Sequence, residues 1–213
     1  MPKRLLYILA ALIVIAILIA IPAVNLTFKN TGAILEVDFL DVGQGDAVLI
    51  KTPAKQNILI DGGPNSAVLE QLAANLPWWD RTIDLVVLTH PHDDHVTGLV
   101  DVLDRYEVKK VIYTGALHTA PGYIAWLKAI RDKSIPLSIS DRPQTIELGN
   151  DIRFEIIYPL KNLVNNISGD LNDTSLVAKL TYRNEKFLFT GDAGEAVEQE
   201  LLKTGVDLAA DVL

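Results

Sequence analysis

The feature that most constrains the fold is a cluster of histidines placed directly after a short apolar run. Three of the four histidines in the chain fall in the hexapeptide 90–95, His-Pro-His-Asp-Asp-His. The preceding residues 84–89 are mostly leucine and valine, which predicts a buried strand. Imidazole and carboxylate groups are common protein ligands of divalent transition metals. The sequence therefore predicts an α/β protein with a metal site where a rigid strand ends.

The spacing within the cluster indicates two metal ions. His90 and His92 lie two residues apart, so on an extended strand end both rings point the same way and can reach one cation. Asp94 and His95 follow a turn later and can serve a second cation. Two cations about 3.5–4 Å apart can hold both the attacking and the leaving oxygen of a hydrolysed substrate. A solvated polar loop is the alternative, which the concentration of histidines disfavours.

The start of the chain predicts a membrane segment. Lys3 and Arg4 precede an apolar stretch from Leu5 to Val24 that has no charged residue. A spanning helix needs roughly 17–25 residues, whereas the apolar part of a cleaved signal usually has about 7–15. We therefore expect a single-pass anchor within residues 1–24, with the N-terminus in the cytoplasm, a linker at 25–33 and an extracytoplasmic domain. Cleavage of a signal and secretion is the alternative.

The charge of the domain disfavours a broad nucleic-acid surface. Residues 25–213 hold 17 of the 19 basic residues and all 27 acidic residues, a net charge of −10. Bound cations can nevertheless supply positive charge locally. The adjacent Trp78 and Trp79 indicate packing or a membrane edge more than a base-stacking platform. The absence of cysteine from the sequence excludes disulfides and thiolate ligands.

The hydrophobic pattern predicts two sheets with helices packed outside them. Strands and helices alternate in the first part of the chain, and strands dominate the second. Strands are expected at 34–40, 47–51, 57–60, 85–89, 110–113, 137–140, 145–148, 152–158, 176–182, 187–190 and from 207 onward, and helices at 66–75, 97–103, 123–132 and 194–202.

Two further strand ends complete a family resemblance. Ile60-Asp61-Gly62-Gly63 precedes the histidine cluster and Phe189-Thr190-Gly191-Asp192 follows it. Together with the His-x-His-x-Asp-His run, these segments resemble the metallo-β-lactamase fold signature. Residues 39–47 and 172–177 are similar to the hydrolase domain at the C-terminus of ComEC-type competence proteins. The resemblance implies an α+β domain at 34–213, a four-layer αββα sandwich.

The resemblance also implies two divalent metal ions, zinc or manganese, and their ligands. His90 and His92 would bind the first ion, and Asp94 and His95 the second. Asp192 resembles the carboxylate that bridges both ions. Read from the residues alone, Asp192 is also compatible with a helix N-cap for the segment from Gly194.

Other positions are supporting candidates. Asp61 resembles the family's strand-end aspartate, which orients ligands through hydrogen bonds, although a plain Asp-Gly turn is the alternative. Asn172 and Asp173 stand where many relatives place a third histidine ligand, so Asp173 is a candidate ligand and Asn172 a candidate supporting residue. His118 is a candidate substrate contact. Residues 43–46 form either a hairpin turn or the floor of the site.

The end of the sequence departs from the family pattern. ComEC-type relatives carry a Gly-His-His-Gly-Ser run just after a segment like Ala209 to Leu213, the last residues of this sequence. We therefore expect the second half of the fold to be incomplete, without one metal-binding histidine.

The expected activity follows from the resemblance. It implies a hydrolase in which metal-bound hydroxide is the nucleophile and Asp94 holds or moves its proton. The implied substrate is a phosphodiester, such as DNA handled at the cell surface. Hydrolysis of a lactam, lactone or thioester is one alternative, because an acidic surface suits small neutral substrates. A metal-binding accessory module at the membrane, without turnover, is the other.

Overall fold

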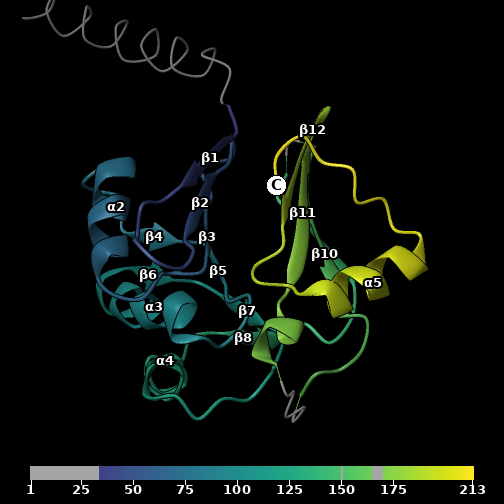
Figure 1. The fold of residues 1–213 in the computed structure, drawn as a ribbon. Helices are drawn as coiled ribbons and strands as arrows, with labels where there is room; N and C mark the ends of the chain where they lie inside the picture. The colour runs from purple at the N-terminus through teal and green to yellow at the C-terminus, as the bar shows by residue number, and fades with distance from the viewer. Residues whose placement is uncertain (1–33, 150, 165–169) are drawn as a thin grey trace, which may run out of the picture. The chain divides into compact units, whose positions relative to one another are not determined.

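Two β-sheets face each other in the described part of the chain, and helices cover the outer face of each sheet (Figure 1). The computed structural model describes residues 34–149, 151–164 and 170–213. Within these residues no helix combines the length and the apolar character needed to cross a membrane. The anchor predicted within residues 1–24 and the linker at 25–33 lie outside the described residues.

The first sheet has an antiparallel start and a parallel remainder. β1, β2 and β3 pair antiparallel, whereas β3, β5, β7 and β8 pair parallel. The parallel strands β3 and β5 are fully buried, which explains their unbroken apolar runs. In sheet order the strands are β1 (Glu36–Phe39), β2 (Val48–Lys51), β3 (Asn57–Ile60), β5 (Leu85–Val87), β7 (Val111–Tyr113) and β8 (Leu137–Ile139).

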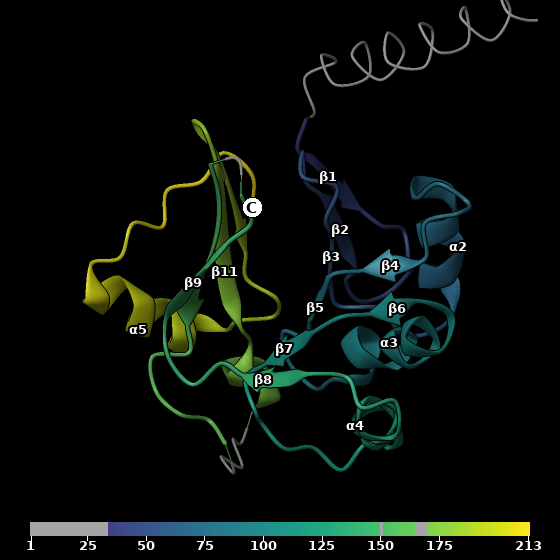
Figure 2. The ribbon, with the colours of Figure 1, turned by 180° about the vertical axis from the view of Figure 1, so that it is seen from behind.

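Three helices cover the outer face of the first sheet (Figure 2). They are α2 (Ala67–Asn75), α3 (Asp93–Arg105) and α4 (Pro121–Asp132). A Cβ on Gly98 would overlap the backbone oxygen of Gly62, so only a glycine lets α3 lie this close to the loop after β3. This close approach fixes the start of α3 against the end of β3.

The second sheet is antiparallel and packs its apolar face against the first. Phe154 and Leu180 of the second sheet share one buried cluster with Ile58 and Val87 of the first. α5 (Glu195–Thr204) covers the outer face. The layers thus follow in the order helix, sheet, sheet, helix, which confirms the predicted αββα arrangement. The strands are β12 (Glu185–Phe189), β11 (Val177–Tyr182), β10 (Ile152–Tyr158) and β9 (Gln144–Glu147), and the 3-10 helix η1 (Leu171–Thr174) precedes β11.

α3 starts earlier than the predicted helix at 97–103. His92 is its extended N-cap residue, and Asp93 and Asp94 occupy the first turn. Acidic side chains are favoured there because they face the positive end of the helix dipole. The histidine cluster is therefore divided between a strand end and the first turn of a helix.

Short pairings were not predicted correctly. The strand expected from residue 207 is wrong in extent, since only Val212 forms a bridge, parallel to Phe187 of β12. β4 (Thr82–Ile83) and β6 (Glu107–Val108) pair in a small separate ladder that was not predicted. Such pairings are too short to leave a periodic pattern in the sequence.

Candidate metal centre

The polar side chains that were predicted for the centre come from the ends of three strands and the start of one helix. Asp61 follows β3, His90 lies beyond β5, and Asp192 follows β12 of the other sheet. β3 and β5 are parallel neighbours, so their carboxyl ends meet at the same edge. His92 caps α3, and His95 lies in its first turn. The fold therefore gathers predicted site residues from both sheets.

Asp61 is the hydrogen-bonding hub of the centre. It is 1% exposed, and its Oδ1 accepts from the Thr89 backbone N–H at 2.8 Å. Its Oδ2 accepts from Thr89 Oγ1 at 2.6 Å and from His95 Nδ1 at 2.9 Å. Since the ionised carboxylate only accepts, Nδ1 of His95 carries a proton and Nε2 points to the rest of the centre. Asp61 thus sets the orientation of His95.

The same chain of hydrogen bonds determines the tautomer of His90. Its Nδ1 lies 3.1 Å from Thr89 Oγ1, whose only hydrogen is donated to Asp61. The hydroxyl must therefore accept from Nδ1–H of His90, which leaves Nε2 with a lone pair. That Nε2 lies 2.9 Å from Nδ1 of His92. Two ring nitrogens this close suit a shared cation.

Asp192 joins two groups of possible ligands. His90, His92 and Asp192 offer three ligand atoms within 4.8 Å of one another, and so do Asp46, His95 and Asp192. One carboxylate oxygen of Asp192 lies 3.5 Å from Nε2 of His95, and the other lies 3.9 Å from Nε2 of His90. Imidazole and carboxylate donors in two groups that share one carboxylate fit a pair of divalent cations.

The electrostatics of the two buried histidines differ. Burial, followed by the neighbouring His95 and His92, lowers the pKa of His90 to about 2, so this ring is neutral and can bind a cation. Burial also opposes the charged form of His95, yet Asp61, Asp192 and Asp94 raise the pKa of His95 to about 9. Burial raises the pKa of Asp61, and the hydrogen bonds from His95 and Thr89 oppose that shift. A cation at His95 would therefore replace a proton.

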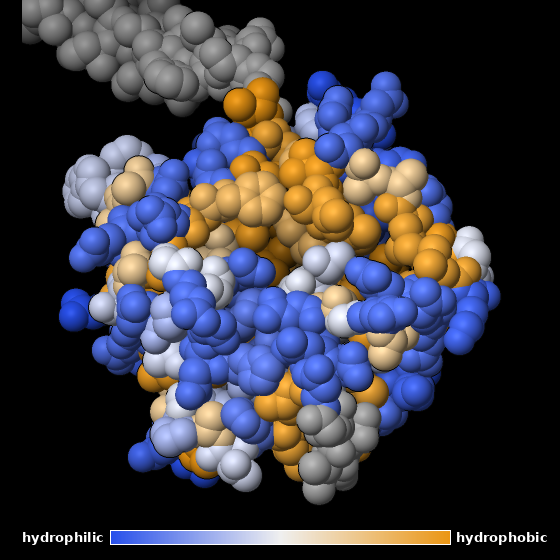
Figure 3. Space-filling model, viewed as in Figure 1, coloured by the Kyte–Doolittle hydropathy of each residue, from blue (hydrophilic) through white to orange (hydrophobic). Residues whose placement is uncertain are grey.

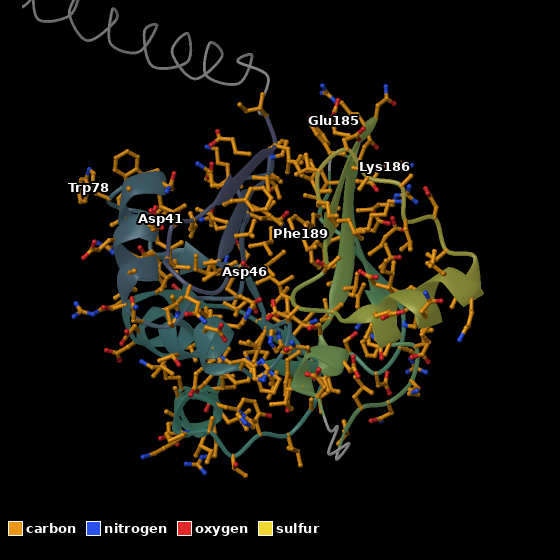
Figure 4. All side chains as sticks on the ribbon, in the orientation of Figure 1. Asp41, Asp46, Trp78, Glu185, Lys186 and Phe189 are labelled. Carbon is orange, nitrogen blue, oxygen red and sulfur yellow. The ribbon has the colours of Figure 1, made fainter. Side chains whose placement is uncertain are left out.

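Asp46 is a candidate ligand that the sequence analysis did not identify. It lies in the loop between β1 and β2 (Figure 4), and its backbone oxygen accepts from the Gly63 N–H at 2.9 Å. Asp94, the predicted ligand, belongs to neither group, although its charge contributes to the raised pKa of His95. The structure thus favours the site-floor interpretation of residues 43–46. The Gly-x-Gly-Asp pattern was the available signal, but it fits an ordinary hairpin equally well.

Comparison with known proteins decides the family. Residues 40–211 match the model of the metallo-beta-lactamase superfamily. The chain belongs to this superfamily. The match confirms the predicted resemblance, and members of the superfamily are generally metal-dependent hydrolases whose fold typically binds two divalent metals.

Several individual proteins are similar to the chain. The chain is 23% identical over 200 residues to ComE operon protein 3 of Bacillus subtilis (strain 168), covering 84% of this chain and 24% of that protein. It therefore spans about a quarter of that relative's length. CmlA, a diiron β-hydroxylase from Streptomyces venezuelae, superposes with a TM-score of 0.52 at 19% identity, over 83% of this chain and 34% of that chain. A metallo-beta-lactamase from Cronobacter sakazakii superposes with a TM-score of 0.49 at 14% identity, over 79% of this chain and 70% of that chain. At 19% identity the similarity to CmlA shows the fold alone.

The remaining predicted residues, Asn172, Asp173 and His118, belong to neither ligand group. Asp173 is in η1, and its backbone oxygen accepts from the Tyr158 hydroxyl at 3.3 Å. Oδ1 of Asn172 is buried and has no hydrogen-bond partner among the described residues. Nδ1 of His118 lies 3.1 Å from the Pro91 backbone oxygen, and its ring centroid is 6.2 Å from that of His92. Of these residues, His118 contacts a member of a ligand group.

A cavity of about 290 Å³, lined by both polar and apolar residues, adjoins the centre. Phe39, Leu188, Phe189 and Leu213 line it, and Asp46 lies at its border with the metal centre. Figure 3 shows apolar side chains gathered on this face, over β1 and β12. The described lining contains no lysine or arginine. Positive charge on this side of the centre would therefore have to come from bound cations.

Replacing Asp61 with asparagine is expected to weaken metal binding. An amide has one accepting oxygen and one donating nitrogen, so it cannot accept from Thr89 and His95 as the carboxylate does. Loss of such a supporting hydrogen bond typically lowers metal affinity by about 10–100-fold. Competition with a chromophoric chelator measures the metal dissociation constants.

The matched control for this change is Asp84→Asn. The Asp84 carboxylate also accepts from a backbone N–H, that of Asn57 at 2.9 Å, but it takes no part in the centre. The metal affinity of the Asp84→Asn protein should equal that of the unchanged chain. Equal affinities for all three proteins would contradict the role of Asp61 as the hub.

Proposed function

We propose that this chain is a two-cation hydrolase that cleaves phosphodiesters, held at the outer side of the cytoplasmic membrane by residues 5–24. The observation that carries the proposal is the shared carboxylate of Asp192, whose two oxygens face histidines of different ligand groups. Paired cations are suited to phosphodiesters because they stabilise the attacking and the leaving oxygen together. The acidic body of the domain would repel an anionic substrate, so the bound cations would have to supply the positive charge that attracts it to the centre.

Each residue of the centre has a defined part in the proposed reaction. Bound cations would supply Lewis acidity and lower the pKa of a water molecule. His90 and His92 would hold one cation and His95 and Asp46 the other, and Asp192 would serve both groups. Asp61 and Thr89 keep the two buried imidazoles oriented.

Asp94 is proposed as the proton acceptor. It belongs to neither ligand group, so its carboxylate remains free to take a proton from the attacking water. It is placed in the first turn of α3, next to His95, by the N-cap at His92. A ligand and a proton acceptor respond differently to removal, which makes the assignment testable.

Replacement of Asp46 with alanine should therefore affect metal binding, whereas replacement of Asp94 with alanine should affect kcat. Asp46→Ala is expected to lower affinity for one of the two cations by at least about tenfold, the smallest loss typical of supporting residues. Asp94→Ala is expected to retain two cations and to lower kcat by about 10²–10⁴-fold, the range for a lost general base. Metal content by mass spectrometry and steady-state kinetics separate the outcomes. If the Asp94→Ala protein loses a cation and the Asp46→Ala protein does not, Asp94 is the ligand and Asp46 is not.

The function is tested by offering the metal-loaded full chain two chromogenic substrates. We expect hydrolysis of bis(p-nitrophenyl) phosphate and none of a cephalosporin lactam. His92→Ala should abolish the activity, whereas Glu198→Gln, on the exposed surface of α5, should not change it. Faster lactam hydrolysis would favour the small-substrate alternative. Full metal occupancy without hydrolysis of either substrate would favour the accessory module.

A further inference from the structure

Two adjacent tryptophans lie on the surface and take no part in the metal centre. Trp78 is 80% exposed and Trp79 is 69% exposed, with their rings edge to face at 5.5 Å. Figure 4 shows Trp78 pointing away from the body of the domain. The third tryptophan of the chain, Trp126, is fully buried. Two large exposed aromatic side chains side by side indicate a surface that meets a partner.

The loop that carries the two tryptophans is fixed to the domain. The Asp80 backbone N–H donates to the Pro77 oxygen at 2.8 Å and closes a tight turn. The Asp80 side chain accepts from Nδ2 of Asn57 at 3.0 Å and from the Thr82 N–H at 3.1 Å. Asn57 is itself buried. The rings are therefore presented outward on a rigid turn, so little conformational entropy is lost when they are buried against a partner.

The turn lies at the edge of the domain where the described chain begins. Nζ of Lys51 donates to the Asn75 backbone oxygen at 3.2 Å, at the C-terminal end of α2. The same ammonium pairs with Glu36, the first residue of β1, and with Asp38. Figures 1 and 2 show α2 and the start of β1 at the same end of the first sheet. The metal centre lies at the other end of β3, beyond Ile60.

The sequence ahead of β1 indicates the partner. Residues 5–24 are apolar and uncharged, and the nine residues 25–33 separate them from the described domain. Nine extended residues span at most about 30 Å, so an anchored chain keeps this edge of the domain near the bilayer surface. Tryptophan is enriched at the boundary between lipid headgroups and acyl chains.

We propose that Trp78 and Trp79 insert into the interface of the bilayer that holds residues 5–24, and so orient the metal centre away from the membrane. The inference rests on the proposed membrane anchoring. At this edge Glu36 and Asp38 are paired with Lys51, which offsets part of their charge, and the Asp80 carboxylate accepts a hydrogen bond from Asn57. The contact gives the domain a second attachment point and a single orientation.

The test measures tryptophan fluorescence of the full chain in phosphatidylcholine vesicles, with and without brominated acyl chains. Brominated lipid should quench the unchanged protein. It should not quench the double variant Trp78→Ala/Trp79→Ala, whose only tryptophan is the buried Trp126. Adding Leu202→Trp to the double variant places an exposed tryptophan on α5 instead, where Leu202 is 62% exposed. This control should also remain unquenched.

The outcomes separate the inference from the proposals on which it rests. Retention of the chain in carbonate-washed vesicles without quenching would overturn the tryptophan contact alone. Release of the chain by carbonate would overturn the anchoring and the contact together, and would leave the hydrolase assay unaffected. Quenching of the Leu202→Trp control would overturn the proposed orientation. A blue shift of the tryptophan fluorescence that grows with protein concentration, without quenching, would show that a second copy of the chain, not lipid, covers Trp78 and Trp79.

Discussion

Replacing Asp192 with alanine is expected to remove both cations and to lower kcat/KM by at least about three orders of magnitude. Each tenfold loss corresponds to about 1.4 kcal/mol of transition-state stabilisation, and metal ions supply several kcal/mol. The reason is that Asp192 is the one residue common to both ligand groups. Metal content and kcat/KM with a chromogenic phosphodiester measure the effect.

Glu198→Gln is the control for the Asp192 variant. Glu198 is an exposed carboxylate on α5, the helix that follows the same strand end, and it is outside both ligand groups. Its removal changes the net charge in the same direction without touching a ligand. An Asp192→Ala protein that keeps two cations and full activity would show that the shared-carboxylate geometry has no part in catalysis.

Replacing Gly45 with alanine is expected to reduce the free energy of unfolding by about 3 kcal/mol or more, since strained backbone and overpacking each cost about 1–3 kcal/mol. Gly45 has a φ of +91°, and a Cβ there would overlap the backbone oxygen of Asp94 and lie 2.9 Å from its Cβ. The loop would have to move away from α3 and carry Asp46 with it. Chemical denaturation of the full chain in detergent measures the stability.

Gly43→Ala separates the two causes. Gly43 lies in the same loop with a φ of +84°, but a Cβ there would meet nothing within 4 Å. Only the backbone strain applies, so the expected loss is about 1–3 kcal/mol. Metal binding should be weaker in Gly45→Ala and unchanged in Gly43→Ala. Equal effects of the two substitutions would contradict the close packing of the loop on α3.

The sequence identified those parts of the centre that follow a strand with a clear hydrophobic pattern. Asp61, His90 and Asp192 each lie just beyond such a strand, and the topology brings these strand ends together. The helix of His95 was predicted to start too late, because the first turn of α3 is polar and has no periodic apolar residues.

The residues that the sequence could not place depend on contacts between distant segments. Asp46 enters the centre because Gly45 packs against Asp94, a contact across many residues that leaves no local signal. The role of Thr89 arises because its hydroxyl lies between Asp61 and His90. Neither contact follows from a regular spacing of residues in the sequence, so only the folded structure reveals them. The choice between Asp46 and Asp94 as ligand illustrates the same limit.

The ion pairs of Lys51 would have a mechanical consequence if the proposed anchor attaches the domain through its first strand. β1 is an edge strand, and force transmitted through residues 25–33 would act first on Glu36. An edge strand held by backbone hydrogen bonds alone can peel away one pair at a time. Lys51 links Glu36 and Asp38 on β1 to the end of α2, so a pull on the tether is shared among β1, β2 and α2. The strand that would bear the load is thereby tied to two neighbouring elements and not by backbone hydrogen bonds alone.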